Sequence, residues 1–138
     1  MGNGRSVVEQ YFKAVNAADL DGVRSLLTDD VDFVAPGPVR GGPDMVLAWM
    51  GPFLDAFPGI DHQIQALAES GDTVMTEITV RGTHQKPMVT PQGEVPPTGK
   101  SVDIPALNAM RLRDGKIASL HIYFDQMGFM GQLGLLPG

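Results

Sequence analysis

The chain has 138 residues, which is the size of one domain with a hydrophobic core of its own. Its net charge of −6 and scattered Lys and Arg residues argue against nucleic acid and anionic membranes as partners, because both need a basic face. Without cysteine there is no disulfide framework, no thiolate nucleophile and no cysteine zinc site. We expect a single domain over residues 1–138 in the cytoplasm, since no run reaches transmembrane length and no signal-peptide core follows the N-terminus.

The first half of the chain has apolar residues at helical spacing, interrupted by cap and turn residues. In chain order these patterns predict a helix over 6–16 that opens with the capping box Ser6-Val-Val-Glu9, a short helix capped by Asp19, a strand over 31–35, and a helix that starts at Pro43 and ends at Pro58-Gly59.

The second half alternates between apolar and polar residues, as strands do. It predicts strands over 60–69, 73–84, 101–113 and 116–124, a proline-rich loop over 86–99, and a short C-terminal helix. Helices followed by a strand meander indicate an α+β fold. We expect a curved, mixed but mostly antiparallel sheet that wraps around the N-terminal helices as a cone, with an open mouth for a small ligand.

The last strand carries the strongest candidate for chemistry. Strand alternation puts His121, Tyr123 and Asp125 on one face, where burial of three polar groups would be costly without a purpose. Desolvation in an apolar cavity raises the pKa of a carboxyl towards the range that a general base needs. Asp125 can equally cap the helix that follows, and the two roles can coexist.

Several other side chains are candidates for the site. His84 ends a strand before a loop, and both it and His121 have the chemistry to polarise a carbonyl. Asn108 lies in the middle of an apolar strand face and needs a partner, which can be a water or an enolate oxygen. His62 is interpreted as structural. The three histidines are far apart in sequence, so we expect no metal site. Side chains that can shape the pocket are Tyr11, Trp49, Phe53, Phe57, Met75, Tyr123, Met127 and Met130.

Short motifs extend this interpretation to nearly the whole chain. They are Tyr11–Asp19, Phe57–Gly59, Gly71–Val74, Arg81–His84, Pro97–Lys100, Arg111–Ile117, Tyr123–Asp125 and Gln132–Leu135. In their order and spacing the chain resembles the SnoaL-like polyketide cyclases of the nuclear transport factor 2-like (ketosteroid isomerase-like) superfamily. Two segments depart from that family's pattern, Ser119–His121 and the loop over 85–94. We expect these departures to change which substrate is bound more than they change the acid–base scheme.

The resemblance implies a cystatin-like α+β cone with a deep apolar pocket, no cofactor and a homo-oligomeric state. It also implies that Asp125 is the general acid/base of an intramolecular aldol closure, and that His84 belongs to the same pocket. We therefore expect a cyclase or isomerase of polyketide-type secondary metabolism, such as antibiotic biosynthesis. Asp125 would move a proton on an apolar, carbonyl-containing small molecule, while His84, His121 and Asn108 stabilise the oxyanion or orient water.

Two other functions remain open. Water addition, such as epoxide opening, would need Asp103 or Arg111 to face inward, and alternation with Ile104 and Met110 favours the opposite. A non-catalytic binding or assembly module would be indicated by a filled cone in which Asp125 bonds only to backbone amides of the C-terminal helix. Apolar residues on both strand faces also predict a second covered surface, and hence a homodimer or higher homo-oligomer.

Overall fold

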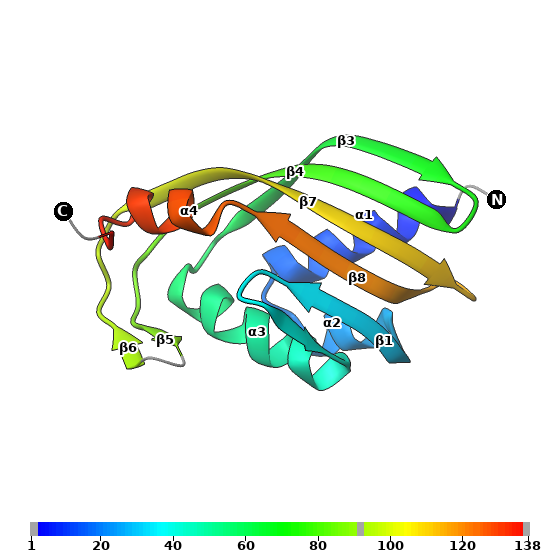
Figure 1. The fold of residues 1–138 in the computed structure, drawn as a ribbon, viewed down its shortest axis with the longest axis horizontal. Helices are drawn as coiled ribbons and strands as arrows, with labels where there is room; N and C mark the ends of the chain where they lie inside the picture. Colours follow the sequence, from blue (N-terminus) through cyan, green and yellow to red (C-terminus); the bar gives the residue numbers. More distant parts are fainter. Residues whose placement is uncertain (1–2, 91–92, 137–138) are drawn as a thin grey trace.

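Six strands form one curved sheet, in the order β2-β1-β8-β7-β4-β3 (Figure 1). Only β1 and β8 run parallel; every other neighbouring pair is antiparallel. The strands are β1 (Leu27–Ala35), β2 (Val39–Gly41), β3 (Asp61–Ser70), β4 (Thr73–Thr83), β7 (Ser101–Arg113) and β8 (Lys116–Phe124). This computed structural model describes residues 3–90 and 93–136.

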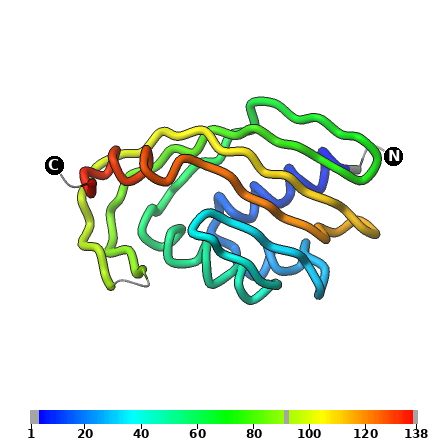
Figure 2. The backbone as a smooth tube through the Cα atoms, in the orientation of Figure 1, coloured from blue at the N-terminus to red at the C-terminus, as the bar shows by residue number. Residues whose placement is uncertain are grey.

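Three helices cover one face of the sheet, and a fourth continues from the end of β8 (Figures 1 and 2). They are α1 (Asn3–Asn16), α2 (Leu20–Ser25), α3 (Pro43–Ala56) and α4 (Gln126–Gln132). Within the described residues, none of these helices is long and apolar enough to cross a membrane. The expected α+β cone is confirmed: a curved, mostly antiparallel sheet wraps around the N-terminal helices.

Strand alternation decides which side chains enter the cone. In β7 the inward series is Val102, Ile104, Ala106, Asn108 and Met110, all buried, whereas the residues between them are exposed or half-buried. In β8 the inward positions include Leu120 and Ile122, which are buried as well. The two strands therefore present an apolar concave face to the helices, with Asn108 as a polar group within it.

Most predicted elements are confirmed. Asp19 caps α2, and its Oδ1 accepts a hydrogen bond from the backbone N–H of Gly22 at 2.9 Å. Pro43 is the first residue of α3. The strands β3, β4, β7 and β8 lie within a residue of their predicted bounds. These elements are local, so caps and period-two alternation are enough to find them.

The capping box at Ser6 is wrong, because α1 begins three residues earlier. The Ser6 hydroxyl lies inside the helix and accepts a hydrogen bond from the side chain of Gln10 at 3.2 Å. The backbone N–H of Arg5, in the first turn, donates to Glu69 Oε1 on β3 at 2.8 Å. A side chain distant in sequence thus satisfies part of the first turn in place of a local cap.

The segment 86–99 is more than a loop. It contains the short strands β5 (Met88–Thr90) and β6 (Gly93–Val95), which pair antiparallel with each other and stand apart from the main sheet. Figure 2 shows this pair below the end of the sheet that carries α4. Met88 is buried, so the pair is anchored to the body of the molecule. Proline density concealed these strands, as it concealed β2 between Pro38 and Pro43.

Candidate functional site

His121 and Tyr123 share one face of the last strand, as predicted, but that face is the outer one. Leu120 and Ile122 point into the cone, so His121 and Tyr123 point away from it. Tyr123 is 51% exposed. The interpretation that these two side chains enter the pocket from β8 is therefore corrected by the phase of the strand. Asp125 is exposed as well, but it follows the end of β8, so strand alternation does not assign it to either face.

The side chain of His121 contacts a carboxylate on that outer face. Its Nε2 lies 2.9 Å from Oδ2 of Asp32 on the neighbouring parallel strand β1. The ring is half-buried, while the carboxylate is largely exposed. This contact connects β8 to β1 and gives His121 a structural role. A catalytic role for His121 stays a prediction.

Asp125 is the N-cap of α4. Its Oδ1 accepts a hydrogen bond from the backbone N–H of Gly128 at 2.9 Å, and its Oδ2 has no hydrogen-bond partner among the described residues. The cap interpretation is confirmed. The acid–base role is a separate property of the same carboxylate and stays a prediction.

His84 is the buried polar group at the end of β4. Its side chain is fully buried, and its ring stacks on Phe57 with centroids 5.2 Å apart and planes 18° apart. The backbone N–H of Thr98 donates to Nδ1 at 3.1 Å. A backbone amide can only donate, so Nδ1 is the accepting nitrogen and the ring proton lies on Nε2.

The Nε2–H of His84 is a hydrogen-bond donor without an acceptor. Among the described residues it is buried and has no partner. An unmade hydrogen bond at a buried donor costs about 1–3 kcal/mol, so such a group indicates a strained site or a missing ligand. A ligand oxygen would satisfy it.

Aromatic side chains connect His84 to α4. Phe57 lies 5.9 Å from Phe129 of α4, and Phe53 lies within 4.8 Å of Phe57 and 5.6 Å of Phe129, between ring centroids. Trp49 is 6.3 Å from Phe124, which in turn is 6.2 Å from Phe129. Phe53, Phe57 and Trp49 thus belong to one aromatic cluster with Phe124 and Phe129, and their role in shaping the pocket stays a prediction. Phe129 was missed, because only the tertiary structure turns α4 inward.

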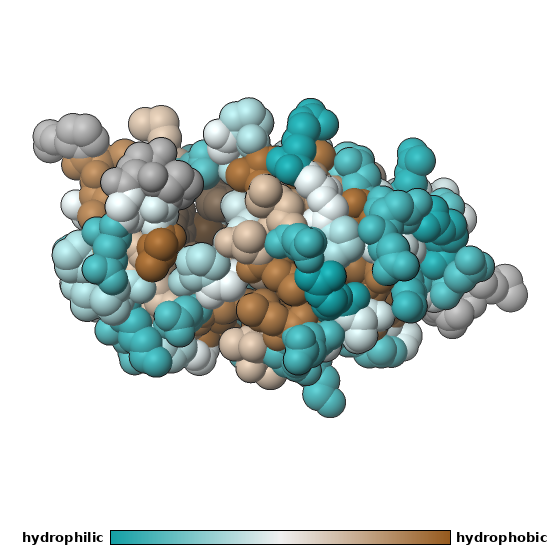
Figure 3. Space-filling view, turned by 90° about the horizontal axis from the view of Figure 1, so that it is seen from below, coloured by the Kyte–Doolittle hydropathy of each residue, from teal (hydrophilic) through white to brown (hydrophobic). Residues whose placement is uncertain are grey.

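The surface beside these elements is hollowed. Figure 3 shows a recess with a hydrophobic floor on the face below the sheet, at the end of the molecule that carries β5 and β6. A small ligand entering from this face would meet apolar walls, which is typical of ligand sites in folds of this kind.

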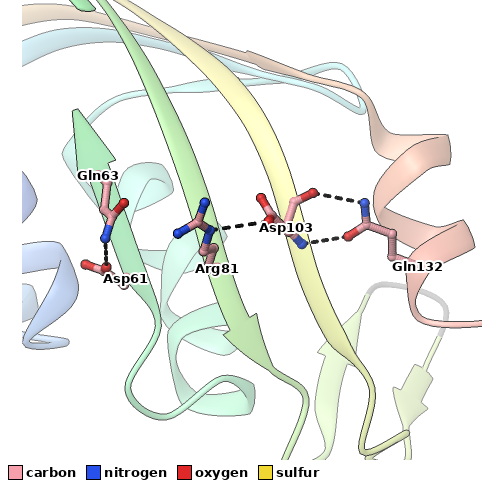
Figure 4. Close-up of polar contacts among 5 residues, drawn as sticks. All are labelled: Asp61, Gln63, Arg81, Asp103 and Gln132. Carbon is pink, nitrogen blue, oxygen red and sulfur yellow. Dashed lines mark hydrogen bonds and ion pairs between the residues drawn. The ribbon is translucent and has the colours of Figure 1, made fainter. Parts of the chain in front are cut away.

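Gln132 holds α4 in this position. Its Oε1 accepts a hydrogen bond from the backbone N–H of Asp103 at 2.7 Å, and its Nε2 donates to the backbone oxygen of Asp103 at 3.0 Å (Figure 4). Asp103 lies on the part of β7 that extends beyond the pairing with β8. The amide of Gln132 therefore replaces a strand neighbour at the sheet edge.

Two more predicted residues face the interior. Asn108 is 2% exposed and pairs in register with Thr76, whose buried hydroxyl has no partner among the described residues. Tyr11 is also buried, and burial raises the pKa of its phenol above the usual range, so the hydroxyl keeps its proton. These groups add hydrogen-bonding capacity to an otherwise apolar interior.

Other predicted pocket residues do not line the cone. Met75 is 44% exposed on the outer side of β4, and Met127 is 69% exposed on α4. Their assignment to the pocket is corrected, together with that of Tyr123, because strand and helix phase turn them outward. Met130 is half-buried and packs against the core.

The histidines and carboxylates are dispersed. His62 lies near α1, His84 inside the cone and His121 on the outer face, and no three His, Asp or Glu side chains in the described part of the chain form a metal-binding group. Each carboxylate side chain is exposed except Asp61, which is half-buried. His84 is thus the histidine that is fully buried inside the cone.

Three solved structures resemble this one over nearly their whole length. AclR from Streptomyces galilaeus, a candidate hydroxylase, shares 25% identity at a TM-score of 0.82, with 96% of each chain covered. IdmH from Streptomyces antibioticus, a candidate polyketide cyclase, shares 28% identity at a TM-score of 0.79, covering 94% of this chain and 97% of that one. A protein of ketosteroid isomerase-like fold from Catenulispora acidiphila shares 17% identity at a TM-score of 0.77, covering 94% and 93%.

The fold and its enclosed polar group define a small α+β cone of the nuclear transport factor 2-like class. The profile of the SnoaL-like domain matches residues 8–120, and no curated protein matches significantly. The chain belongs to the SnoaL-like domain family. Because 438 solved chains match this fold, the cone alone does not specify a reaction, and the function has to be argued from the site.

Proposed function

We propose that the chain is a cofactor-free, cytoplasmic cyclase or isomerase of polyketide-type secondary metabolism, acting on an apolar small molecule that contains a carbonyl group. The observation that carries the proposal is the buried Nε2–H of His84, which has no acceptor among the described residues. Membership of the SnoaL-like family and the likeness to a candidate polyketide cyclase support the same class of reaction.

In this proposal His84 donates a hydrogen bond to the substrate carbonyl oxygen. Removal of a proton from the neighbouring carbon leaves negative charge on that oxygen, and a donor already held in place stabilises the charge without reorganisation. Thr98 holds the donor through Nδ1, and Phe57 holds the plane of the ring. The apolar surroundings strengthen the interaction, because they exclude water.

Asp125 is the proposed acid–base group. It stands where β8 ends and α4 begins, one helical turn before Phe129, and its Oδ2 is free of protein hydrogen bonds among the described residues. A substrate that spans the cone mouth would bring its reacting carbon to this oxygen. Asn108 would then orient a second substrate oxygen or a water, and Tyr11 would contribute a phenolic donor.

One observation favours a second candidate, a non-catalytic ligand-binding module. Asp125 is exposed, and the hydrogen bond that its side chain makes is to a backbone amide of α4, as a structural cap would be. Water addition has less support. Asp103 pairs with Arg81 on the outer face, and Arg111 is exposed, so neither forms a relay inside the cone.

The test is turnover of a panel of polycyclic aromatic β-keto esters, followed by chromatography and mass spectrometry in ¹⁸O-labelled water. Cyclisation or isomerisation leaves the mass unchanged or lower by one water, without incorporation of label, whereas water addition incorporates it. We expect His84→Phe to lose about 100-fold in rate, as loss of an oxyanion donor does, and His84→Gln, which retains an N–H, to lose less. Binding without turnover would favour the binding module, and full activity of His84→Phe would refute the proposal.

We further propose that the outer face of the sheet is covered in a homodimer. Met75, Leu107 and Tyr123 are 44%, 41% and 51% exposed on β4, β7 and β8, and Leu107 and Tyr123 are direct cross-strand partners. Exposed apolar groups gathered on one face are typical of interaction surfaces. Sedimentation should show a dimer that Leu107→Glu dissociates, and a monomeric parent would contradict the proposal.

A further inference from the structure

A second recess lies outside the cone, between α1 and the edge strand β3. It is an open groove with a volume of about 560 Å³, which is within the range of small-molecule sites. Figure 1 shows α1 passing beneath β3 and β4 at this edge of the sheet. The residues that matter for its chemistry are Glu9, Phe12, Lys13, Asn16, His62 and Ile64. None of them belongs to the site around His84.

Asn16 fixes the tautomer of His62. The backbone N–H of His62 donates to Asn16 Oδ1 at 2.8 Å, which establishes that this atom is the amide oxygen. The amide nitrogen then donates to the backbone oxygen of His62 at 3.3 Å. Nδ1 of His62 also lies 2.8 Å from the same Oδ1, and an amide oxygen can only accept. Nδ1 therefore carries the proton, and Nε2 presents a lone pair.

That lone pair is available to a ligand. Nε2 of His62 has no hydrogen-bond partner among the described residues, and it is not among the enclosed polar atoms, so it is reachable from the groove. Burial of the ring lowers the pKa of His62 to about 4, although Asp61 acts in the opposite direction. The imidazole is thus neutral at physiological pH, and Nε2 accepts rather than donates.

The groove combines apolar and charged side chains. The ring of Phe12 lies parallel to that of His62, with centroids 6.0 Å apart and planes 21° apart. Ile64 adds an aliphatic surface from β3, while the opposite charges of Glu9 and Lys13 stand on the α1 side. Near His62 the groove therefore offers apolar contact and one hydrogen-bond acceptor.

We propose that this groove is a binding site for a largely apolar small molecule that presents one hydroxyl donor, as a phenol does, to Nε2 of His62. The site is independent of the proposed reaction in the cone, because it shares no residue with it. It extends the interpretation of His62 as structural: the hydrogen bonds to Asn16 position the ring, and the opposite nitrogen is left for a ligand.

The test is a titration of the ¹⁵N-labelled full-length protein with phenol, followed by ¹H–¹⁵N correlation spectra, with anisole as the matched probe. Anisole has the same ring but no donor. We expect phenol to shift the signals of Phe12, Asn16, His62 and Ile64, and to bind about fivefold more tightly than anisole, as one hydrogen bond to an accessible acceptor allows.

The variant His62→Phe retains an aromatic ring but lacks the acceptor. In it, phenol should bind no better than anisole. Equal affinity of the two probes for the parent protein would overturn the proposal, and this comparison does not depend on the folding of any variant. Shifts confined to the surroundings of His84 would overturn it as well, because they would place the phenol site inside the cone.

Discussion

The backbone N–H of Thr98 donates to Nδ1 of His84 at 3.1 Å, although the two residues are 14 positions apart. Pairing on both sides of His84 enforces this contact: its own N–H donates to the oxygen of Lys100 at 2.9 Å, and its oxygen accepts from Gly99 N–H at 3.0 Å. The way in which the segment before β7 returns to the end of β4 therefore decides which nitrogen of the ring carries the proton.

This relationship predicts an Nε2–H tautomer for His84. Long-range ¹H–¹⁵N spectra of the histidine rings should show it directly, and an Nδ1–H signal would contradict the geometry. His84→Phe leaves the half-buried Thr98 amide without its acceptor, which costs about 1–3 kcal/mol, but it also removes the unpaired Nε2–H, so the free energy of unfolding should fall by less than that amount. The control is His121→Phe, whose contact with Asp32 is largely exposed on the carboxylate side and contributes about 1 kcal/mol or less.

Variants of Asp125 can separate its role as a helix cap from its proposed role in catalysis. Asp125→Asn retains a capping side chain and should change the unfolding free energy by only a few tenths of a kcal/mol, whereas Asp125→Ala should cost about 1 kcal/mol. If the carboxylate moves the proton, both variants lose activity by about 100-fold or more. Asp19 caps α2 with the same geometry, so Asp19→Asn is the matched control. An active Asp125→Asn enzyme would leave the residue as a cap alone.

Gln132 is expected to govern the mobility of α4. Gln132→Ala removes both hydrogen bonds to the backbone of Asp103, and the exposed amide makes the expected loss about 1 kcal/mol. Hydrogen exchange should accelerate across 126–132 while the central strands stay protected. Gln126→Ala, an exposed change in the same helix, should leave the exchange of α4 unaltered. Equal exchange in the two variants would show that Phe129 and Leu133 suffice to hold the helix.

Because the pKa of His62 is lowered in the folded protein, we expect the free energy of unfolding to fall in mild acid. Its folded pKa, about 4, lies below the ordinary value near 6.5, so the unfolded chain takes up a proton that the folded one refuses. The contribution of His62 to the free energy of unfolding is complete above about pH 6.5 and is lost as the pH falls to about 4. Its upper bound is about 3 kcal/mol. Urea unfolding between pH 7 and 4 measures it.

The control for this prediction is His62→Phe, which cannot titrate at this position. The groups that face the ring are Asp61 on β3 and Glu9 and Lys13 on α1, and all three are present in both proteins. The difference between the two pH profiles therefore isolates the imidazole. Parallel profiles would mean that His62 takes up its proton as readily when folded as when unfolded.

Local signals predicted much of the fold. Asp19 and Pro43 mark element ends by chemistry that acts over a few residues, and the alternation in β7 marks its buried face. Local signals failed where a residue or strand distant in sequence determines the start of an element or its pairing. Glu69 takes the place of a cap in α1, and the strands β5 and β6 form in a segment that its prolines made look irregular.

The candidate site shows the same division. Sequence alone determined that His121 and Tyr123 share a face, because the period of a strand is a local property. Only the tertiary structure decided that this face is the outer one, since helices packed on the opposite side of the sheet. The tertiary structure also leaves the Nε2–H of His84 without an acceptor among the described residues, and it places His62 beside a groove. Each depends on a hydrogen bond between segments far apart in the chain, which no local pattern encodes.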